Sequence, residues 1–164
     1  MDRIKFTESE IALYTEVAEQ RFRRSRGLGP GHGEVQSDSR EYQRHLHGAA
    51  GELGFARLAG YQWPYDEDDF GASGDFPGGE EVRTTEYERG SLVVFDSDPR
   101  DRNFVLMVIS LTWVPQARYA GFLPGSSVDS EGDRPGCRVR AGSKPQLWVP
   151  QDRLDSRFPI GDRS

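Results

Sequence analysis

Six consecutive apolar residues, Phe104 to Ile109, constrain the fold of this chain more than any other feature. An apolar run of this length is typical of a strand that is buried on both faces at the centre of a sheet. Both faces of that sheet must then be covered, and we expect helices to cover them. The predicted fold class is therefore α/β, with a mixed central β-sheet flanked by helices.

Two helices are predicted in the N-terminal part of the chain. Thr7 and Glu10 have the spacing of a capping box, and apolar residues follow at helical intervals, which predicts a helix over about residues 7–26. A second helix is predicted over about residues 40–59, with Gly60 ending it. The glycine-rich segment between the two helices is predicted to be a linker or a loop.

From about residue 80 onward, the pattern predicts strands. They are expected over about residues 80–86, 91–96, 104–109, 118–123 and 146–149. Residues 87–90 have the composition of a turn, so we expect the first two strands to form a hairpin. The polar, glycine-rich stretch 124–145 is predicted to be a long loop, and residues 150–155 a short helical turn. The whole chain, residues 1–164, is predicted to form a single domain.

Composition excludes several classes of protein. No apolar run approaches the length of a membrane span, and the N-terminus lacks the apolar stretch of a secretory signal, so we expect a cytoplasmic protein with no membrane partner. Cys137 is the only cysteine, which excludes an intrachain disulfide and a thiolate zinc site. The net charge of -6 argues against binding to nucleic acid mainly by bulk electrostatic attraction.

Three carboxylates and one cation occur in an order that suits a divalent-metal site beside a phosphate. Glu52 lies in a predicted helical segment rich in small residues, and Asp75 precedes a turn rich in proline and glycine. Glu81 and Arg83 then follow at the start of a strand. Residues two apart on a strand share a face, so Glu81 and Arg83 should point the same way and Glu80 the other way. Glu81 is therefore the better candidate ligand.

The chemistry of these groups suggests a role for each. Oxygen-ligated Mg²⁺ or Mn²⁺ supplies a nucleophilic water and relieves negative charge at a phosphodiester. Asp75 and Glu81 are the candidate metal ligands, and Glu52 is a candidate for orienting a metal-bound water or for a further ligand. Arg83 is a candidate partner for a phosphate oxygen or the transition state.

The order of these motifs resembles the PD-(D/E)XK, or restriction-endonuclease-like, nuclease superfamily. The resemblance covers roughly residues 40 to 113, and the sequence from Glu81 to Thr85 is especially similar to small phage-encoded members. It implies a restriction-endonuclease-like fold and a Mg²⁺- or Mn²⁺-dependent endonuclease that acts on DNA, with RNA left open, and that is associated with a phage or a mobile element. A homodimer would suit the cutting of two strands.

The resemblance also implies roles for individual residues. Asp75, Glu81, the carbonyl of Val82 and Glu52 would form the metal site, and Arg83 and Thr84 would contact nucleic acid. Arg83 stands where the superfamily usually has lysine. A guanidinium stays protonated and cannot act as a general base, which leaves an inactive variant possible.

Other interpretations of the same residues remain open at this point. Glu81 and Arg83 can be a surface ion pair, and Glu52 can be a solvated helix residue. The chain as a whole can be a catalytically inactive nucleic-acid-binding module of nuclease fold. It can also be a small acidic interaction protein of the anti-defence type.

Overall fold

The predicted buried strand forms the centre of a mixed four-stranded sheet. The computed structural model describes residues 3–27, 39–63, 75–131, 138–140 and 146–158; Cys137 and most of the predicted linker lie outside these ranges. The sheet has the order β1-β5-β4-β2. These strands are β1 (Ile4–Lys5), β5 (Gln116–Pro124), β4 (Asn103–Ser110) and β2 (Glu80–Thr85). Because β4 runs antiparallel to β5 and parallel to β2, the predicted mixed sheet is confirmed.

Both N-terminal helices form where the sequence predicts them. They are α1 (Glu8–Ser25) and α2 (Arg40–Ala59). The backbone N–H of Glu10 donates to the Thr7 hydroxyl, and the Glu10 carboxylate accepts from the Thr7 N–H at 2.7 Å, which completes the predicted capping box. Gly60 ends α2 with a φ of 70°, a left-handed conformation that favours glycine. Neither helix has the apolar length that crossing a membrane requires, and no other described helix does.

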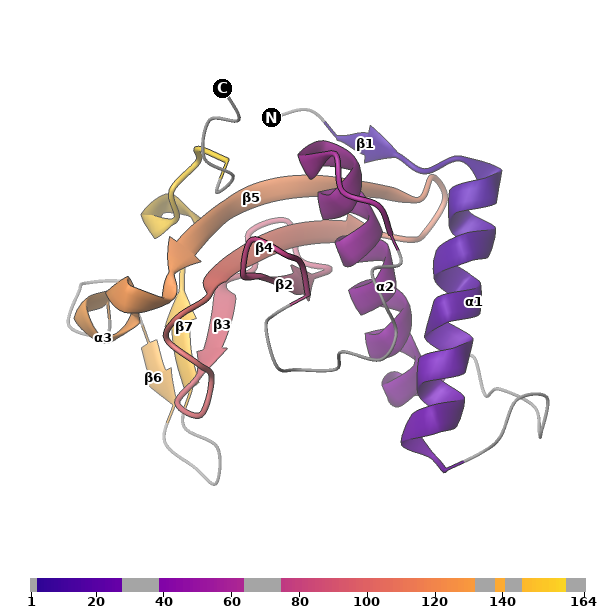
Figure 1. Cartoon of the computed structure of the whole chain (residues 1–164). Helices are drawn as coiled ribbons and strands as arrows, with labels where there is room; N and C mark the ends of the chain where they lie inside the picture. The colour runs from indigo at the N-terminus through magenta and orange to yellow at the C-terminus, as the bar shows by residue number, and fades with distance from the viewer. Residues whose placement is uncertain (1–2, 28–38, 64–74, 132–137, 141–145, 159–164) are drawn as a thin grey trace.

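The two N-terminal helices cover only one face of the sheet. Figure 1 shows α2 packed on the sheet and α1 packed on α2. On that face Val105, Met107 and Ile109 of β4 pack among apolar side chains of both helices.

The opposite face of the four-stranded sheet is covered by a second, three-stranded sheet. Its order is β3-β7-β6, with strands β3 (Leu92–Phe95), β7 (Gln146–Val149) and β6 (Arg138–Arg140). Phe104 and Leu106 of β4 pack against its apolar residues. The expectation that helices cover both faces was therefore wrong, because the inner face of a sheet buries apolar side chains as well as a helix does.

The predicted hairpin of residues 80–96 is also wrong. β2 pairs with β4 in parallel, whereas β3 pairs with β7 in the other sheet. Parallel neighbours need a crossover connection, and here β3 itself supplies it by passing over the face opposite the helices. The turn at residues 87–90 therefore marks a change of sheet and not a hairpin.

Two smaller features differ from the prediction. β1 was missed because two residues are too few to show a periodic pattern. The predicted loop 124–145 contains the 3-10 turn η1 (Gly125–Ser127), the short helix α3 (Val128–Glu131) and β6. The predicted helical turn near the C-terminus is confirmed as η2 (Gln151–Arg153).

Gly51 sets the distance between α2 and β2. A Cβ added at this glycine would lie 2.2 Å from Cγ2 of Thr84 and 3.6 Å from Cγ1 of Val82. The helix can therefore approach the strand this closely only with a glycine at that position. Because Glu52 follows Gly51 directly, the same contact places the Glu52 backbone beside β2.

Gly51→Ala is expected to lower the free energy of unfolding by about 1–3 kcal/mol, because the new methyl group overlaps Thr84. Thr84→Ser removes the clashing methyl group, so the double variant should regain most of that loss. Urea denaturation of the wild type, the two single variants and the double variant measures both effects. A double variant as unstable as Gly51→Ala would show that the tight contact does not cause the loss.

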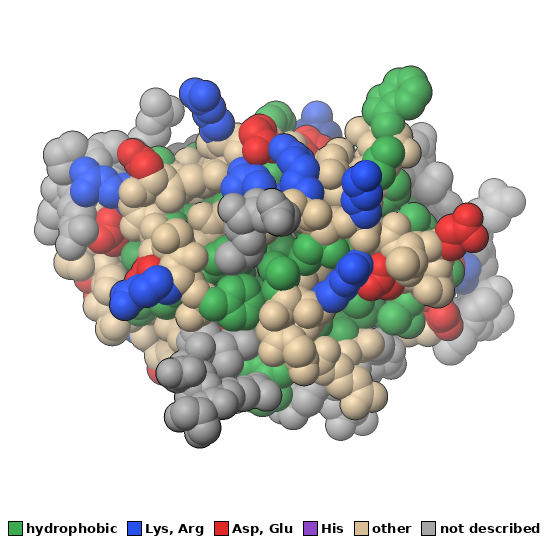
Figure 2. All heavy atoms as spheres, turned by 90° about the horizontal axis from the view of Figure 1, so that it is seen from above, with side chains coloured by type: hydrophobic (Ala, Val, Ile, Leu, Met, Phe, Trp, Pro, Cys, Tyr) green, Lys and Arg blue, Asp and Glu red, His purple; other side chains and the backbone are tan. Residues whose placement is uncertain are grey.

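The surface seen from above in Figure 2 carries no continuous region of one charge. Basic and acidic side chains are interspersed over this face, with apolar and uncharged polar groups between them. Mixed charge of this kind is ordinary for a protein surface. Among its described residues, this face therefore offers no extended basic surface for binding a nucleic acid.

Candidate active site

Asp75 is fastened to the outer edge of β2. Its backbone N–H donates to the Glu80 carbonyl at 2.9 Å, and its Oδ2 accepts from the Val82 N–H at 2.7 Å. β2 is the last strand of its sheet, so these bonds occupy the edge that faces away from β4. The N–H and C=O of one residue in an extended strand point to the same edge. The Val82 carbonyl therefore lies on the edge that Asp75 occupies.

Glu52 is held firmly on α2. The guanidinium of Arg21 donates to both of its carboxylate oxygens at 2.8 Å, and the Trp63 indole N–H donates to Oε2 at 3.1 Å. Only 13% of the Glu52 side chain is exposed. The interpretation of Glu52 as a solvated helix residue is therefore wrong, since three charge-assisted or neutral hydrogen bonds fix a mostly buried carboxylate.

Glu81 and Arg83 share one face of β2, as predicted. In register with Phe104 and Leu106, they point toward the second sheet and form an ion pair with each other. Their side chains are 15% and 24% exposed, so this is not the surface pair of the simpler interpretation.

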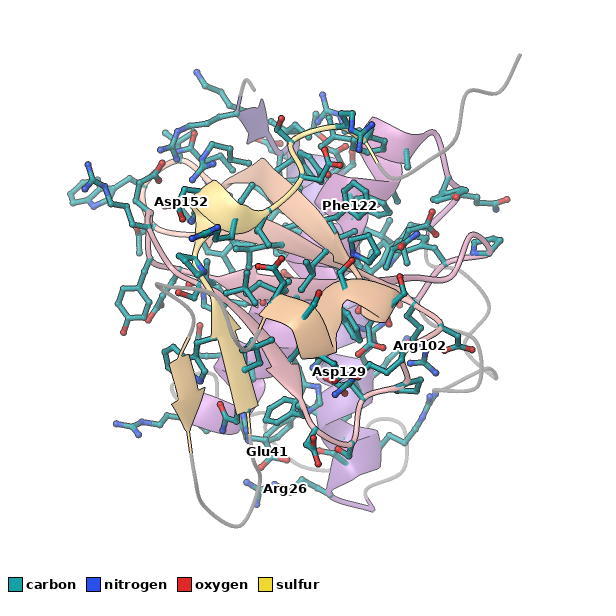
Figure 3. All side chains as sticks on the ribbon, turned by 90° about the vertical axis from the view of Figure 1, so that its left-hand side faces the viewer. Arg26, Glu41, Arg102, Phe122, Asp129 and Asp152 are labelled. Carbon is teal, nitrogen blue, oxygen red and sulfur yellow. The ribbon has the colours of Figure 1, made fainter. Side chains whose placement is uncertain are left out.

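Two further residues complete the network around this pair. Arg102 precedes β4 (Figure 3) and donates from Nη1 to Oε2 of Glu81 at 2.5 Å. Asp98 pairs with the guanidinium of Arg83 at 2.9 Å. Both oxygens of Glu81 are therefore bound by arginines, and Arg83 lies between two carboxylates.

Glu80 and Thr84 point to the other face of β2, toward α2. Glu80 is only 2% exposed, and the Tyr61 hydroxyl donates to its Oε1 at 3.2 Å. Thr84 packs against Gly51. The prediction that Glu81 and not Glu80 shares a face with Arg83 is confirmed.

The electrostatics of Asp75 show that the charges of the two other predicted acids reach it. Burial raises the pKa of Asp75, and the negative charge of Glu52 raises it further. The hydrogen bond from the Val82 N–H acts in the opposite direction, Glu81 adds to the increase, and Arg21 opposes it; the resulting pKa is about 7. The negative charges of Glu52 and Glu81 therefore both disfavour the ionised form of Asp75.

Within the described ranges, no group of three or more His, Cys, Asp or Glu side chains is arranged to hold a metal ion as it stands. The contacts already described give the reason. Glu52 is turned toward Arg21 and Trp63, and Glu81 toward Arg83 and Arg102, so arginines supply the positive charge that a cation would supply. Asp75, Glu81 and the Val82 carbonyl carry hard oxygen atoms, the ligand type that Mg²⁺ and Mn²⁺ prefer.

A groove of about 840 Å³ is lined in part by Val82 and Arg83, which contact Asp75 and Glu81. Side chains from the N-terminal half of α2 form one wall, β2 from Val82 to Thr85 lines the floor, and residues of β3 form the other wall. Arg83 belongs both to this floor and to the Glu81 network. The groove and the candidate active site are therefore linked through Arg83, although the three acids do not line the groove.

Sequence reasoning missed the partners of the acids and the groove. Arg21 and Arg102 belong to no recognisable motif in the sequence. One signal was present: Arg40, Arg44 and His47 are spaced four and three residues apart, which places them on one face of α2. No family model, curated protein or solved structure matches this chain. The geometry of these residues is therefore the basis for a functional assignment.

Proposed function

We propose that this protein is a metal-dependent nuclease that hydrolyses phosphodiester bonds in DNA. The observation that carries the proposal is the position of Asp75 at the outer edge of β2. The charges of Glu52 on α2 and of Glu81 on β2 both act on Asp75 there, and its pKa rises to about 7. Acids that repel one another in a buried position are costly to maintain. Such an arrangement is explained when a cation and a phosphate complete it.

Asp75, Glu81 and the Val82 carbonyl would hold Mg²⁺ or Mn²⁺. When bound, the ion acts as a Lewis acid and lowers the pKa of a coordinated water. Glu52, held by Arg21 and Trp63, would orient the attacking water through a hydrogen bond. Because the Glu52 carboxylate is already fixed, it would not have to reorient during the reaction. Such preorganisation accounts for much of the rate enhancement of enzymes.

Arg83 would neutralise negative charge on the phosphate. Its guanidinium lies 5.6 Å from the Phe95 ring centroid and 5.8 Å from that of Phe104, so apolar surroundings strengthen its interaction with an anion. Because arginine stays protonated, the proposed role is that of a phosphate partner and not of a general base.

One observation favours a second candidate function, that of a catalytically inactive DNA-binding module. Arg21 and Trp63 bind the carboxylate oxygens of Glu52. Two other arginines bind those of Glu81. A metal would have to compete with Arg83 and Arg102 for Glu81. If those ion pairs persist in solution, the chain would bind DNA without cutting it.

Incubation of the purified protein with supercoiled plasmid tests the proposal. Mg²⁺ or Mn²⁺ should support nicking, and EDTA should abolish it. Glu81→Gln is expected to slow nicking by at least about 100-fold, because a candidate ligand loses its charge. Asp155→Asn is the matched control, since Asp155 also pairs with an arginine two residues further along but lies outside the site.

The outcomes separate the two candidate functions. A shift of DNA in a gel without nicking under either metal would support the inactive module. Nicking that persists at full rate in Glu81→Gln would show that the acids at the edge of β2 are not the active site.

A further inference from the structure

We infer that the groove beside the acids binds a single strand of DNA and leads it along the edge of β2. This inference rests on the proposed function, since it names the form of DNA that the same site would accept. The two walls of the groove differ in chemistry, and that difference carries the inference.

One wall is basic. Arg40, Arg44 and His47 line the groove from the same face of α2. Both arginines are exposed, and neither forms an ion pair with another described residue. Nδ1 of His47 donates to the Gln43 carbonyl at 2.7 Å, which fixes the orientation of the imidazole ring. Glu86 also lines the groove, and its carboxylate lies 3.9 Å from Nε2 of His47, so the excess of positive charge on this wall comes from Arg40 and Arg44. In a protein with a net charge of -6, these two exposed arginines are suited to contact successive phosphates.

The opposite side of the groove is aromatic and apolar. Val93 and Phe95 of β3 line it, and so does Tyr87, which is 70% exposed. Exposed aromatic rings next to a basic wall are the usual means by which proteins bind single strands, because every base has a flat face that can stack.

A duplex does not match this pair of walls. Its outer surface is made of phosphates and sugars, and its base faces are stacked inside, so an aromatic wall would find no partner there. A single strand carries phosphates along one side and unstacked bases along the other. The groove volume of about 840 Å³ also lies within the roughly 300–1,000 Å³ typical of sites for small ligands. A short stretch of one strand fits such a space better than a double helix.

The floor of the groove links this strand to the candidate active site. Val82 and Arg83 line the groove, and the Val82 N–H donates to Asp75. Arg83 in turn contacts Glu81. A strand lying in the groove would therefore pass next to the two residues that contact Asp75 and Glu81.

Binding to the metal-free full-length protein tests this inference without any cleavage. Fluorescence anisotropy in EDTA would compare a labelled thymidine oligonucleotide of about 12 residues with a blunt hairpin duplex and a uridine oligonucleotide of equal length. We expect the thymidine strand to bind at least about tenfold more tightly than the duplex.

Variants in the two walls should have distinct effects. Arg40→Gln with Arg44→Gln is expected to weaken binding by at least about tenfold and to reduce the slope of log affinity against log salt by about 1.4, the value for two lost phosphate contacts on a single strand. Tyr87→Ala should weaken binding by about tenfold through lost stacking. Arg24→Gln with Arg57→Gln removes the same charge from helix positions outside the groove, and it should leave the salt slope unchanged.

Three results would overturn the inference. They are equal affinity for the blunt duplex, equal weakening by the control pair of variants, and uridine strands that bind at least about tenfold more tightly than thymidine strands. Failure of the proposed function looks different. If the wall variants behave as expected but no metal supports nicking, the groove assignment stands and only the hydrolytic role is lost.

Discussion

Asp75→Asn should eliminate metal-dependent cleavage and, in the same molecule, increase the stability of the metal-free protein at neutral pH. The loss of cleavage, expected to be at least about 10³-fold, follows from the removal of a charged ligand at the site of the proposed metal. The gain in stability follows from the neighbours of Asp75, because burial and the charges of Glu52 and Glu81 disfavour its ionised form. Asparagine keeps an oxygen that can accept from the Val82 N–H but carries no charge.

The sign and the pH range of the stability effect follow from the pKa of Asp75. The pKa lies near 3.8 in the unfolded chain and is raised to about 7 in the folded protein. The folded state therefore holds the proton more tightly, and the contribution of Asp75 to stability is fully present below about pH 4 and is lost as the pH rises to about 7. The full difference is on the order of 4 kcal/mol, an upper value for a single carboxylate.

Thermal unfolding in EDTA at several pH values between about 4 and 8 measures this effect. The difference in stability between Asp75→Asn and the wild type should grow across that range, and the comparison cancels the titration of the other carboxylates. Saturating Mg²⁺ should narrow the difference by stabilising the wild type alone. A variant that loses cleavage and is also less stable at pH 8 would contradict the account, since misfolding would then explain the lost activity.

Arg21→Met should destabilise the protein more than the loss of a surface ion pair would. Arg21 binds both oxygens of Glu52, and the two side chains are only 23% and 13% exposed. Removal of one partner leaves a mostly buried carboxylate uncompensated, which costs about 3–5 kcal/mol in fully buried pairs. We expect about 2–3 kcal/mol here, because both groups retain some contact with water.

A double variant separates the charge effect from lost packing. Arg21→Met combined with Glu52→Gln leaves no unpaired charge, so it should recover much of the stability lost in Arg21→Met alone. Urea denaturation of the wild type, both single variants and the double variant gives the coupling between the two residues. If the double variant is as unstable as Arg21→Met, the methylene stem of the arginine and not its charge supports the fold.

The sequence determined the features that depend on near neighbours in the chain. The capping box at Thr7, the glycine that ends α2 and the apolar run of β4 are all local patterns, and each predicted its element correctly. The alternation along β2 also placed Glu81 and Arg83 on one face. Three acids could be named as a group, although their order in the chain did not show how their oxygens are oriented.

The tertiary structure decided the features that depend on contacts between distant residues. The turn after β2 is compatible with a hairpin and with a crossover. The crossover forms because β2 pairs with β4 and β3 pairs with β7, instead of β2 and β3 pairing with each other. Arg21 and Arg102 are ordinary arginines in the sequence, and they become partners of Glu52 and Glu81 because folding places them within hydrogen-bonding distance. The groove has the same origin, since α2 and β3 face each other only after the two sheets have packed. Local periodicity carries no information about such pairings, because the free energy that selects them comes from burial and charge across the whole fold.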